Sequence, residues 1–142
     1  MLAIKLSLEQ NKEMREHAVS AYPHECCGFL LGKVSGETKS VERIIAATNT
    51  RDDSPQNRYL IDPKEFMTAD REARKAKLDI VGIYHSHPDH PARPSDFDRD
   101  HAWPFYSYII YSVERGVIAD ARSWLLDEDR SAFSEEAAEN LA

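Results

Sequence analysis

The chain has 142 residues, enough to bury a core of its own, and we expect one domain over residues 1–142. It carries 25 acidic against 18 basic residues, a net charge of −7 with no dense basic cluster, which argues against nucleic acid or an anionic membrane as its main partner. No apolar run approaches the roughly 20 residues that span a bilayer, and the first residues turn charged too soon for a signal peptide. The only two cysteines, Cys26 and Cys27, are adjacent and indicate reduced thiols, so we expect a cytoplasmic protein.

The N-terminal residues predict a short strand followed by a helix. Leu2–Leu6 is the strand candidate. Ser7 and, three residues on, Gln10 form the pattern of a capping box, which predicts that a helix begins here. Pro23 ends this helix. Its apolar face is marked by residues at four-residue intervals: Met14, Ala18 and Tyr22.

Two strands and a loop follow. "ECCGFLLG" (residues 25–32) has the pattern of a buried strand, in which Gly28 indicates a bulge or the close approach of another segment. "SVERIIAAT" (residues 40–48) is the next strand. Thr48–Asn57 is polar and irregular, which is typical of a surface loop, and "RYLI" (residues 58–61) is a short strand candidate.

A second helix is predicted from Asp62 to about Lys77. Asp62 is the N-cap, Pro63 occupies the first helical position and Glu65 lies three residues after the cap. The apolar side of this helix consists of Phe66, Ala69, Ala73 and Ala76. "LDIVGIYHS" (residues 78–86) is the clearest strand and leads into a polar, proline-rich stretch.

The last part of the chain predicts a short helix, a hairpin and a tail. Ser95 can cap the helix, which Pro104 ends, and residues 106–113 and 117–126 pair as the hairpin. We expect residues 127–142, which are acidic and rich in alanine, to be loosely ordered. About seven strands and two or three helices indicate an α/β (α+β) fold, with a mixed, mostly antiparallel sheet flanked by helices in a three-layer-like arrangement.

The stretch "IYHSHPDHPARPSDFD" (residues 83–98) has the composition of a metal site. His85 and His87 are two residues apart at the end of a strand, so their side chains project from the same face. Asp98 lies eleven residues beyond His87, in the first turn of the short helix. Two histidines and one carboxylate leave a fourth tetrahedral position open for water, as catalytic zinc requires.

Each part of this pattern also has a simpler explanation. A lone His-x-His is often a pair of surface histidines, and the prolines can merely stiffen a loop. Ser95 and Asp98 are themselves the ends of a capping box, so that Asp98 needs no metal to explain it. The combination, in fixed register over fourteen residues, favours the metal site, and a capped helix start would hold Asp98 rigid.

The spacing His-Ser-His-Pro, six residues, Ser, two residues, Asp resembles the signature of the JAMM (MPN-plus) metalloproteases, and Glu25 in "PHECCGFLLG" matches the upstream glutamate of that family. The resemblance implies a cytidine-deaminase-like JAMM/MPN fold and one zinc ion per chain held by His85, His87 and Asp98. It implies that Glu25 is the general base and then the general acid, and that Ser95 stabilises the oxyanion. The same ligand set occurs in non-haem iron oxygenases, and the motif spacing favours zinc.

The amino-acid sequence in and around the motif is most similar to that of the short, single-domain prokaryotic members of the family. These resemble peptidases that act on the C-terminal tail of a ubiquitin-like sulfur-carrier protein, at a peptide or isopeptide bond. The resemblance implies such a carrier as partner. We expect residues 48–57 and 91–94 to contact its tail, and Arg93 and Trp103 to bind substrate.

Several alternatives stay open. The chain could be a catalytically silent MPN scaffold, a protein that stores or senses metal, or a RadC-like DNA-repair-associated protein, although that group has Asn where this chain has Ser86 and Ser-Gly where it has Asp89-His90. The sequence leaves monomer and homodimer open.

Four other residues have plainer interpretations than a catalytic one. Cys26 and Cys27 are adjacent in an apolar strand, which favours buried, reduced core thiols over nucleophiles. His90 is expected to be a solvated loop residue, and His101 is expected to pack against Trp103.

Overall fold

The computed structural model describes residues 3–48 and 61–141. In this part of the chain the elements are β1 (Ala3–Lys5), α1 (Leu8–Ala21), β2 (Cys27–Ser35), β3 (Thr38–Ala47), α2 (Pro63–Lys75), β4 (Asp79–Pro88), α3 (Asp96–His101), β5 (Ser107–Glu114), β6 (Val117–Leu126) and β7 (Phe133–Glu139). None of the described helices is long and apolar enough to cross a membrane.

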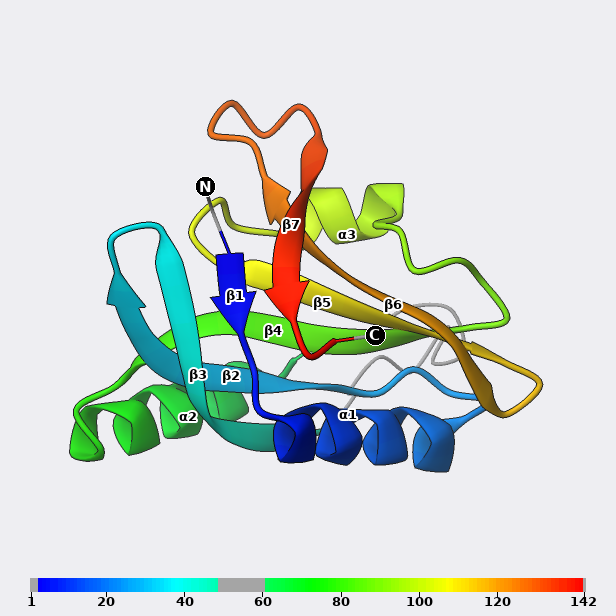
Figure 1. The fold of residues 1–142 in the computed structure, drawn as a ribbon, viewed down its shortest axis with the longest axis horizontal. Coiled ribbons are helices and arrows are strands. Elements are labelled where there is room, and N and C mark those ends of the chain that lie inside the picture. Colours follow the sequence, from blue (N-terminus) through cyan, green and yellow to red (C-terminus); the bar gives the residue numbers. More distant parts are fainter. Residues whose placement is uncertain (1–2, 49–60, 142) are drawn as a thin grey trace.

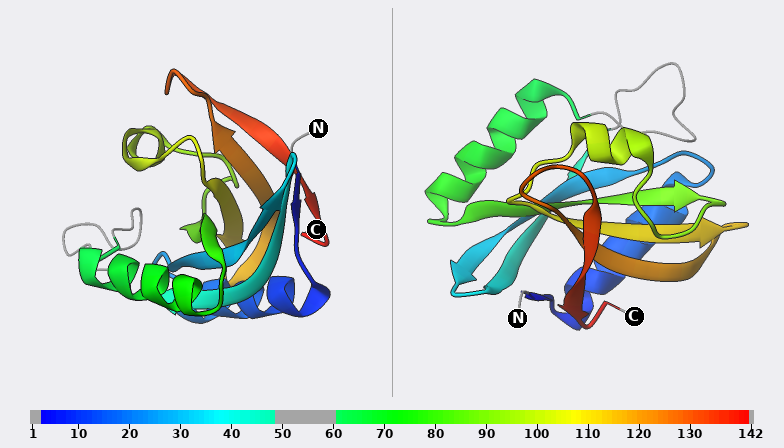
Figure 2. Two further views of the ribbon diagram at one scale, coloured as in Figure 1. Left: turned by 90° about the vertical axis from the view of Figure 1, so that its left-hand side faces the viewer. Right: turned by 90° about the horizontal axis from the view of Figure 1, so that it is seen from above.

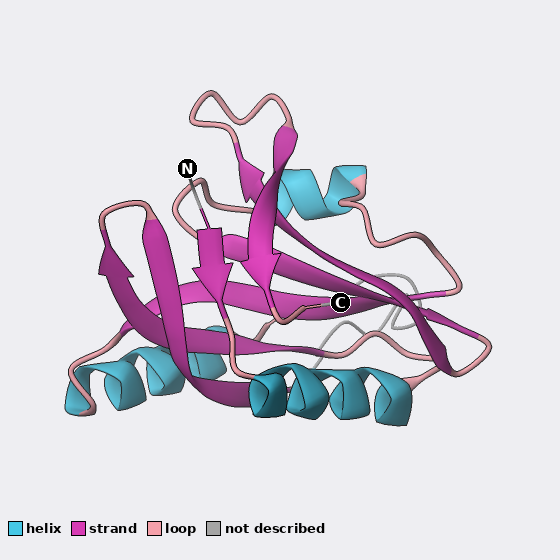
Figure 3. Ribbon diagram, viewed as in Figure 1, coloured by secondary structure: helices cyan, strands magenta, loops and turns pink. Residues whose placement is uncertain are grey.

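The strands form one closed, strongly curved sheet in the order β1-β3-β2-β4-β5-β6-β7 (Figures 1 and 3). β4 is parallel to β5, and β1 is parallel to both β3 and β7, whereas the remaining pairs are antiparallel. The expected mixed, mostly antiparallel sheet is therefore confirmed. β4 lies in the middle of the strand order, so its side chains are covered on both faces.

Two hydrophobic cores lie on opposite faces of the sheet. Alternate residues of β2 divide between them: Leu30 packs in the core that includes Met14 and Ala18 of α1, whereas Phe29 and Leu31 pack in the core that includes Ala69 and Ala73 of α2. β4 divides in the same way, with Tyr84 on the α1 face and Ile83 on the α2 face. α1 and α2 therefore pack on opposite faces of the closed sheet, which confirms the expected flanking helices.

This alternation determines which way the histidines point. His85 and His87 follow Ile83 at two-residue steps, so they lie on the α2 face, beyond the end of that core and next to α3. Tyr84 on the other face packs so closely on β2 that a Cβ atom at Gly28 would overlap its ring. The close approach expected at Gly28 is confirmed.

The predicted helix starts are confirmed, and one predicted end is corrected. Capping boxes begin α1 and α3, and Asp62 caps α2. α2 ends at Lys75 and not near Lys77, so Ala76 is an exposed C-cap residue outside the apolar face. α3 ends at His101, Ala102 is extended, and Pro104 follows three residues after the helix, in agreement with the prediction that Pro104 ends it.

The C-terminal residues differ most from the prediction of a loosely ordered tail. Residues 133–139 form β7, which pairs with β6 and β1 and closes the sheet. The sequence pattern does not indicate this strand, because its buried residue is Glu136 and not an apolar residue. The Glu136 carboxylate accepts a hydrogen bond of 2.8 Å from the Ser123 hydroxyl. With β7, the described residues form seven strands. The strand candidate "RYLI" and the predicted loop at residues 48–57 lie outside the described residues, except for Ile61 and Thr48.

Cys26 and Cys27 are both buried, with 3% and 0% of their surface exposed. Burial raises the pKa of the Cys26 thiol to about 11 and raises the pKa of Cys27 as well. Thiolates are therefore scarce at neutral pH, which supports the prediction of core thiols.

We predict that both thiols resist alkylation in the folded protein. At pH 8 a pKa of about 11 makes the thiolate fraction of Cys26 roughly a hundredfold smaller than at the ordinary pKa of 9.0, and burial blocks the reagent as well. Mass spectrometry after brief treatment with iodoacetamide should show no labelling in buffer and two labels in urea. Rapid labelling of the native protein would contradict this account.

Candidate metal centre

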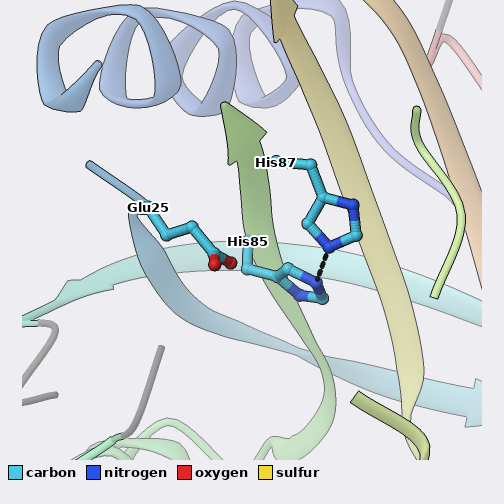
Figure 4. Close-up of side chains that lie close together, drawn as sticks. All are labelled: Glu25, His85 and His87. Carbon is cyan, nitrogen blue, oxygen red and sulfur yellow. Dashed lines mark hydrogen bonds between the residues drawn. The ribbon is translucent and has the colours of Figure 1, made fainter. Parts of the chain in front are cut away.

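The imidazole rings of His85 and His87 lie together at the centre of the candidate site (Figure 4). Their Nε2 atoms are 3.2 Å apart, and the two residues are 0% and 6% exposed. The backbone of His85 is paired with Cys27 of β2 on one side and Ile110 of β5 on the other. The sheet thus fixes the backbone of His85 from both sides, and His87 is paired with Ser112 of β5.

Asp98 reaches the same point from α3. Its Oδ2 atom lies 3.3 Å from His85 Nε2 and 3.1 Å from His87 Nε2. The capping box holds the carboxylate there, because Ser95 N donates to Asp98 Oδ2 at 2.9 Å while Ser95 Oγ accepts from Asp98 N at 3.1 Å. The expected approach of Asp98 to the two histidines and its capping role are therefore both present.

These three atoms fit a tetrahedral metal ion. They form a nearly equilateral triangle with edges of 3.1–3.3 Å. A tetrahedron with metal–ligand bonds of about 2.0–2.1 Å has edges of roughly 3.3–3.4 Å, so a zinc ion would need only a slight expansion of this triangle. The three protein atoms would occupy one face of the tetrahedron and leave the fourth corner open.

The protonation of the three side chains agrees with metal binding. His87 Nδ1 lies 2.9 Å from the Pro91 carbonyl, which can only accept, so Nδ1 is the donor and a neutral His87 ring has its lone pair on Nε2, the atom that faces Asp98. Burial lowers the pKa of His85, which keeps that ring neutral. Burial would raise the pKa of Asp98, but the neighbouring imidazoles lower it overall, so the carboxylate stays ionised.

Glu25 supplies a second carboxylate from the segment between α1 and β2. It is buried, and one of its oxygens lies within 4.8 Å of ligand atoms of both His85 and His87, in a group that could hold a metal ion. Figure 4 shows its carboxylate directed toward His85. Asp98 is in hydrogen-bonding range of both Nε2 atoms, which places it closer to the common point.

A cavity of about 600 Å3 opens onto this group. Its walls include Glu25, His87, Arg93 and Ser95, so the structure brings together these residues that the sequence had singled out. Asp96 and Phe97 also line it and were not predicted. The only sequence signal for them was their place between Ser95 and Asp98.

The other three predicted residues near the site are His90, Trp103 and His101. His90 lines the cavity although it is exposed, as expected for the loop. Trp103 is 61% exposed and is not among the residues that line the cavity; the Arg130 guanidinium lies 5.5 Å from its ring centroid. His101 stacks on Phe97, with ring centroids 4.1 Å apart, rather than on Trp103, because residues four apart share a helix face.

The chain is similar to known proteins in both sequence and structure. The family model described as prokaryotic homologs of the JAB domain matches residues 8–127. The chain is 35% identical over 117 residues to a desampylase from Haloferax volcanii, covering 82% of this chain and 81% of that protein. It is 34% identical over 117 residues to a probable TtuB-protein conjugate cleaving protease from Thermus thermophilus, covering 82% and 72%.

Solved structures share the fold of this chain. The solution structure of a protein from Desulfitobacterium hafniense, 36% identical, has a TM-score of 0.80 over 97% of this chain and 91% of its own. The crystal structure of a JAB1/MPN domain protein from Archaeoglobus fulgidus, 18% identical, has a TM-score of 0.57 over 98% and 99%, which shows the shared fold. The chain therefore belongs to the prokaryotic JAB-domain family, has the JAB/MPN fold and carries the metal-binding group of its JAMM metalloproteases.

Proposed function

We propose that this chain is a zinc metallopeptidase that hydrolyses a peptide or isopeptide bond at the C-terminus of a ubiquitin-like protein. The observation that carries the proposal is the convergence of His85 Nε2, His87 Nε2 and Asp98 Oδ2 within 3.1–3.3 Å at the edge of a cavity. These three side chains would hold one zinc ion at the edge of the cavity. When bound, zinc makes a water molecule more acidic and polarises the scissile carbonyl.

The chain's own residues would then move one proton and stabilise one charge. Glu25 takes a proton from the attacking water as general base and returns it to the nitrogen of the leaving group as general acid. The Ser95 hydroxyl donates to the oxygen on which negative charge develops. This donation is compatible with its capping role, in which the Ser95 oxygen accepts from Asp98 N and its own proton is not used.

The proposed substrate follows from the relatives and from the cavity. One relative is named a desampylase and the other a probable protease for TtuB-protein conjugates. We infer for this chain a ubiquitin-like sulfur-carrier protein whose flexible C-terminal tail enters the cavity. Arg93 in the cavity wall carries a charge that suits a backbone carbonyl or a terminal carboxylate of this tail. Trp103, outside the wall, would contact only the body of the carrier.

We predict that the purified protein binds one zinc ion per chain. His85→Ala and Asp98→Ala should each weaken zinc binding by more than about a hundredfold, because each removes a direct ligand. His101→Ala is the matched control, since His101 is exposed on α3 and contacts none of the three ligands. Metal analysis after dialysis measures the zinc content. Unchanged zinc in both ligand variants would show that the ligands are assigned wrongly.

We predict that Glu25→Gln retains zinc but loses most of the hydrolysis. The substitution keeps the shape of the side chain and removes its basicity, which should lower kcat by about 10²–10⁴-fold. Single-turnover rates with zinc-loaded protein provide the measurement. Hydrolysis at the normal rate would mean that another group is the base.

We predict that the substrate can be identified by mass spectrometry with two sets of ubiquitin-fold carriers. One set carries a single extra amino acid at the C-terminus, and the other is joined through an isopeptide bond to a lysine peptide. Cleavage directly after the carrier's own C-terminus is expected in at least one set. Arg93→Ala should affect the first set more than the second if Arg93 binds a terminal carboxylate. If no carrier of either set is cleaved, the proposed substrate class is wrong.

A further inference from the structure

Three segments that are distant in sequence meet at one end of the sheet (Figures 1 and 2). They are the connection from α1 to β2, which carries Glu25, the end of β4, which carries His87, and the turn between β5 and β6. Asp89, the first residue after β4, is bonded to the other two segments. It is neither a proposed ligand nor a residue of the cavity wall.

Asp89 accepts one hydrogen bond with each carboxylate oxygen. Oδ2 accepts from the Tyr22 hydroxyl at 2.7 Å, and Oδ1 accepts from Arg115 N at 2.9 Å. Its own backbone N–H donates to the Val113 carbonyl at 2.7 Å. The residue has a φ of 55°, in the left-handed region that aspartate and asparagine tolerate better than most residues. Its backbone and side chain are therefore both fixed.

Tyr22 lies three residues before Glu25, and a second link lies directly after it. Cys26 N donates to Ser86 Oγ at 2.8 Å, and Ser86 N donates to the Cys26 carbonyl at 3.2 Å. Glu25 thus lies between Tyr22, which is bonded to Asp89, and Cys26, which is bonded to Ser86 of β4. His87 lies between the same two links, since Ser86 precedes it and Asp89 follows two residues later.

We propose that the hydrogen bond between Tyr22 and Asp89 positions the Glu25 carboxylate relative to the two histidines. The inference rests on the proposed function, in which Glu25 is the base. The link at Ser86 holds the strand side of the Glu25 segment, and the link at Asp89 holds its helix side. Without the second link, the helix side of the segment keeps the backbone hydrogen bond from His24 N to the Ala21 carbonyl (2.8 Å) but loses its bond to the residue after β4, so Glu25 can shift relative to the histidines while the histidines themselves stay in the sheet. Tyr22 and Asp89 are positioning residues in this account.

The test is Tyr22→Phe in the zinc-loaded protein. This substitution keeps the ring and removes the bond. We expect zinc content and KM to be unchanged and kcat to fall about tenfold, less than the hundredfold loss that a displacement of about 1 Å can cause. Asp89→Asn should keep kcat within about twofold, because its amide can accept from Arg115 N and donate to the Tyr22 hydroxyl.

Tyr84→Phe is the matched control. The Tyr84 hydroxyl also makes a 2.7 Å bond, to His17 Nδ1, and Tyr84 lies in the same strand as the histidines, but its side chain is on the opposite face of the sheet. Its loss should leave kcat unchanged. A tenfold loss in this control too would mean that any tyrosine bond near β4 has this effect, and the proposal would be wrong.

Amide hydrogen exchange of the metal-free protein gives a readout independent of activity. Tyr22→Phe should speed exchange at residues 24–26 several-fold and leave residues 29–31 of β2 unchanged. In activity assays, Tyr22→Phe should add no further loss in the Glu25→Gln background, since it acts through Glu25.

Unchanged exchange together with unchanged kcat in Tyr22→Phe would overturn the inference and leave the proposed function intact. Full activity of Glu25→Gln would instead overturn the proposed base, whatever Tyr22→Phe does.

Discussion

The contact of the Asp98 carboxylate with the imidazoles of His85 and His87 is the constraint on which the site depends. A strand can present two side chains at i and i+2, but it cannot present a third ligand at the same point, because the next side chain on that face is about 7 Å farther along. A ligand from a second element is needed. The capping box of α3 supplies it, since the hydrogen bond from Ser95 N holds Asp98 Oδ2 at 3.1–3.3 Å from both rings.

The rest of the molecule supports this meeting of strand and helix. β4 is paired on both sides, so the histidines cannot shift along the strand without breaking two ladders. The proline-rich loop after β4 returns the chain to α3, and on the way the Pro91 carbonyl fixes the ring of His87. Glu25 lies just before β2, and β2 pairs with β4 on the side opposite β5. Residues from three parts of the sequence therefore surround one point, and each is held by an ordinary element of the fold.

Sequence patterns predict the local part of this arrangement well. The capping boxes at Ser7 and Ser95 depend on residues three apart, and the common face of His85 and His87 depends on residues two apart, so short stretches suffice to find them. Glu25 was found only through resemblance to a family, because no local pattern relates it to residues sixty positions later. The Pro91 carbonyl and the Tyr22–Asp89 bond have no signature in the sequence: the first is a backbone atom, and the second joins residues 67 positions apart. β7 was missed since its buried residue is Glu136, whose burial is made tolerable by Ser123, a partner in another strand. The family match ends at residue 127, before this strand.

The central claim is that His85, His87 and Asp98, and not Glu25, hold the metal. X-ray diffraction at the zinc absorption edge, on crystals of the zinc-loaded protein, tests it most directly because the anomalous signal locates the ion and the map shows its ligands. The account predicts one zinc ion per chain, bonded to Nε2 of both histidines and to the Asp98 carboxylate, with Glu25 outside bonding distance. A zinc ion bonded to Glu25 in place of Asp98, or the absence of zinc from this site, would contradict it.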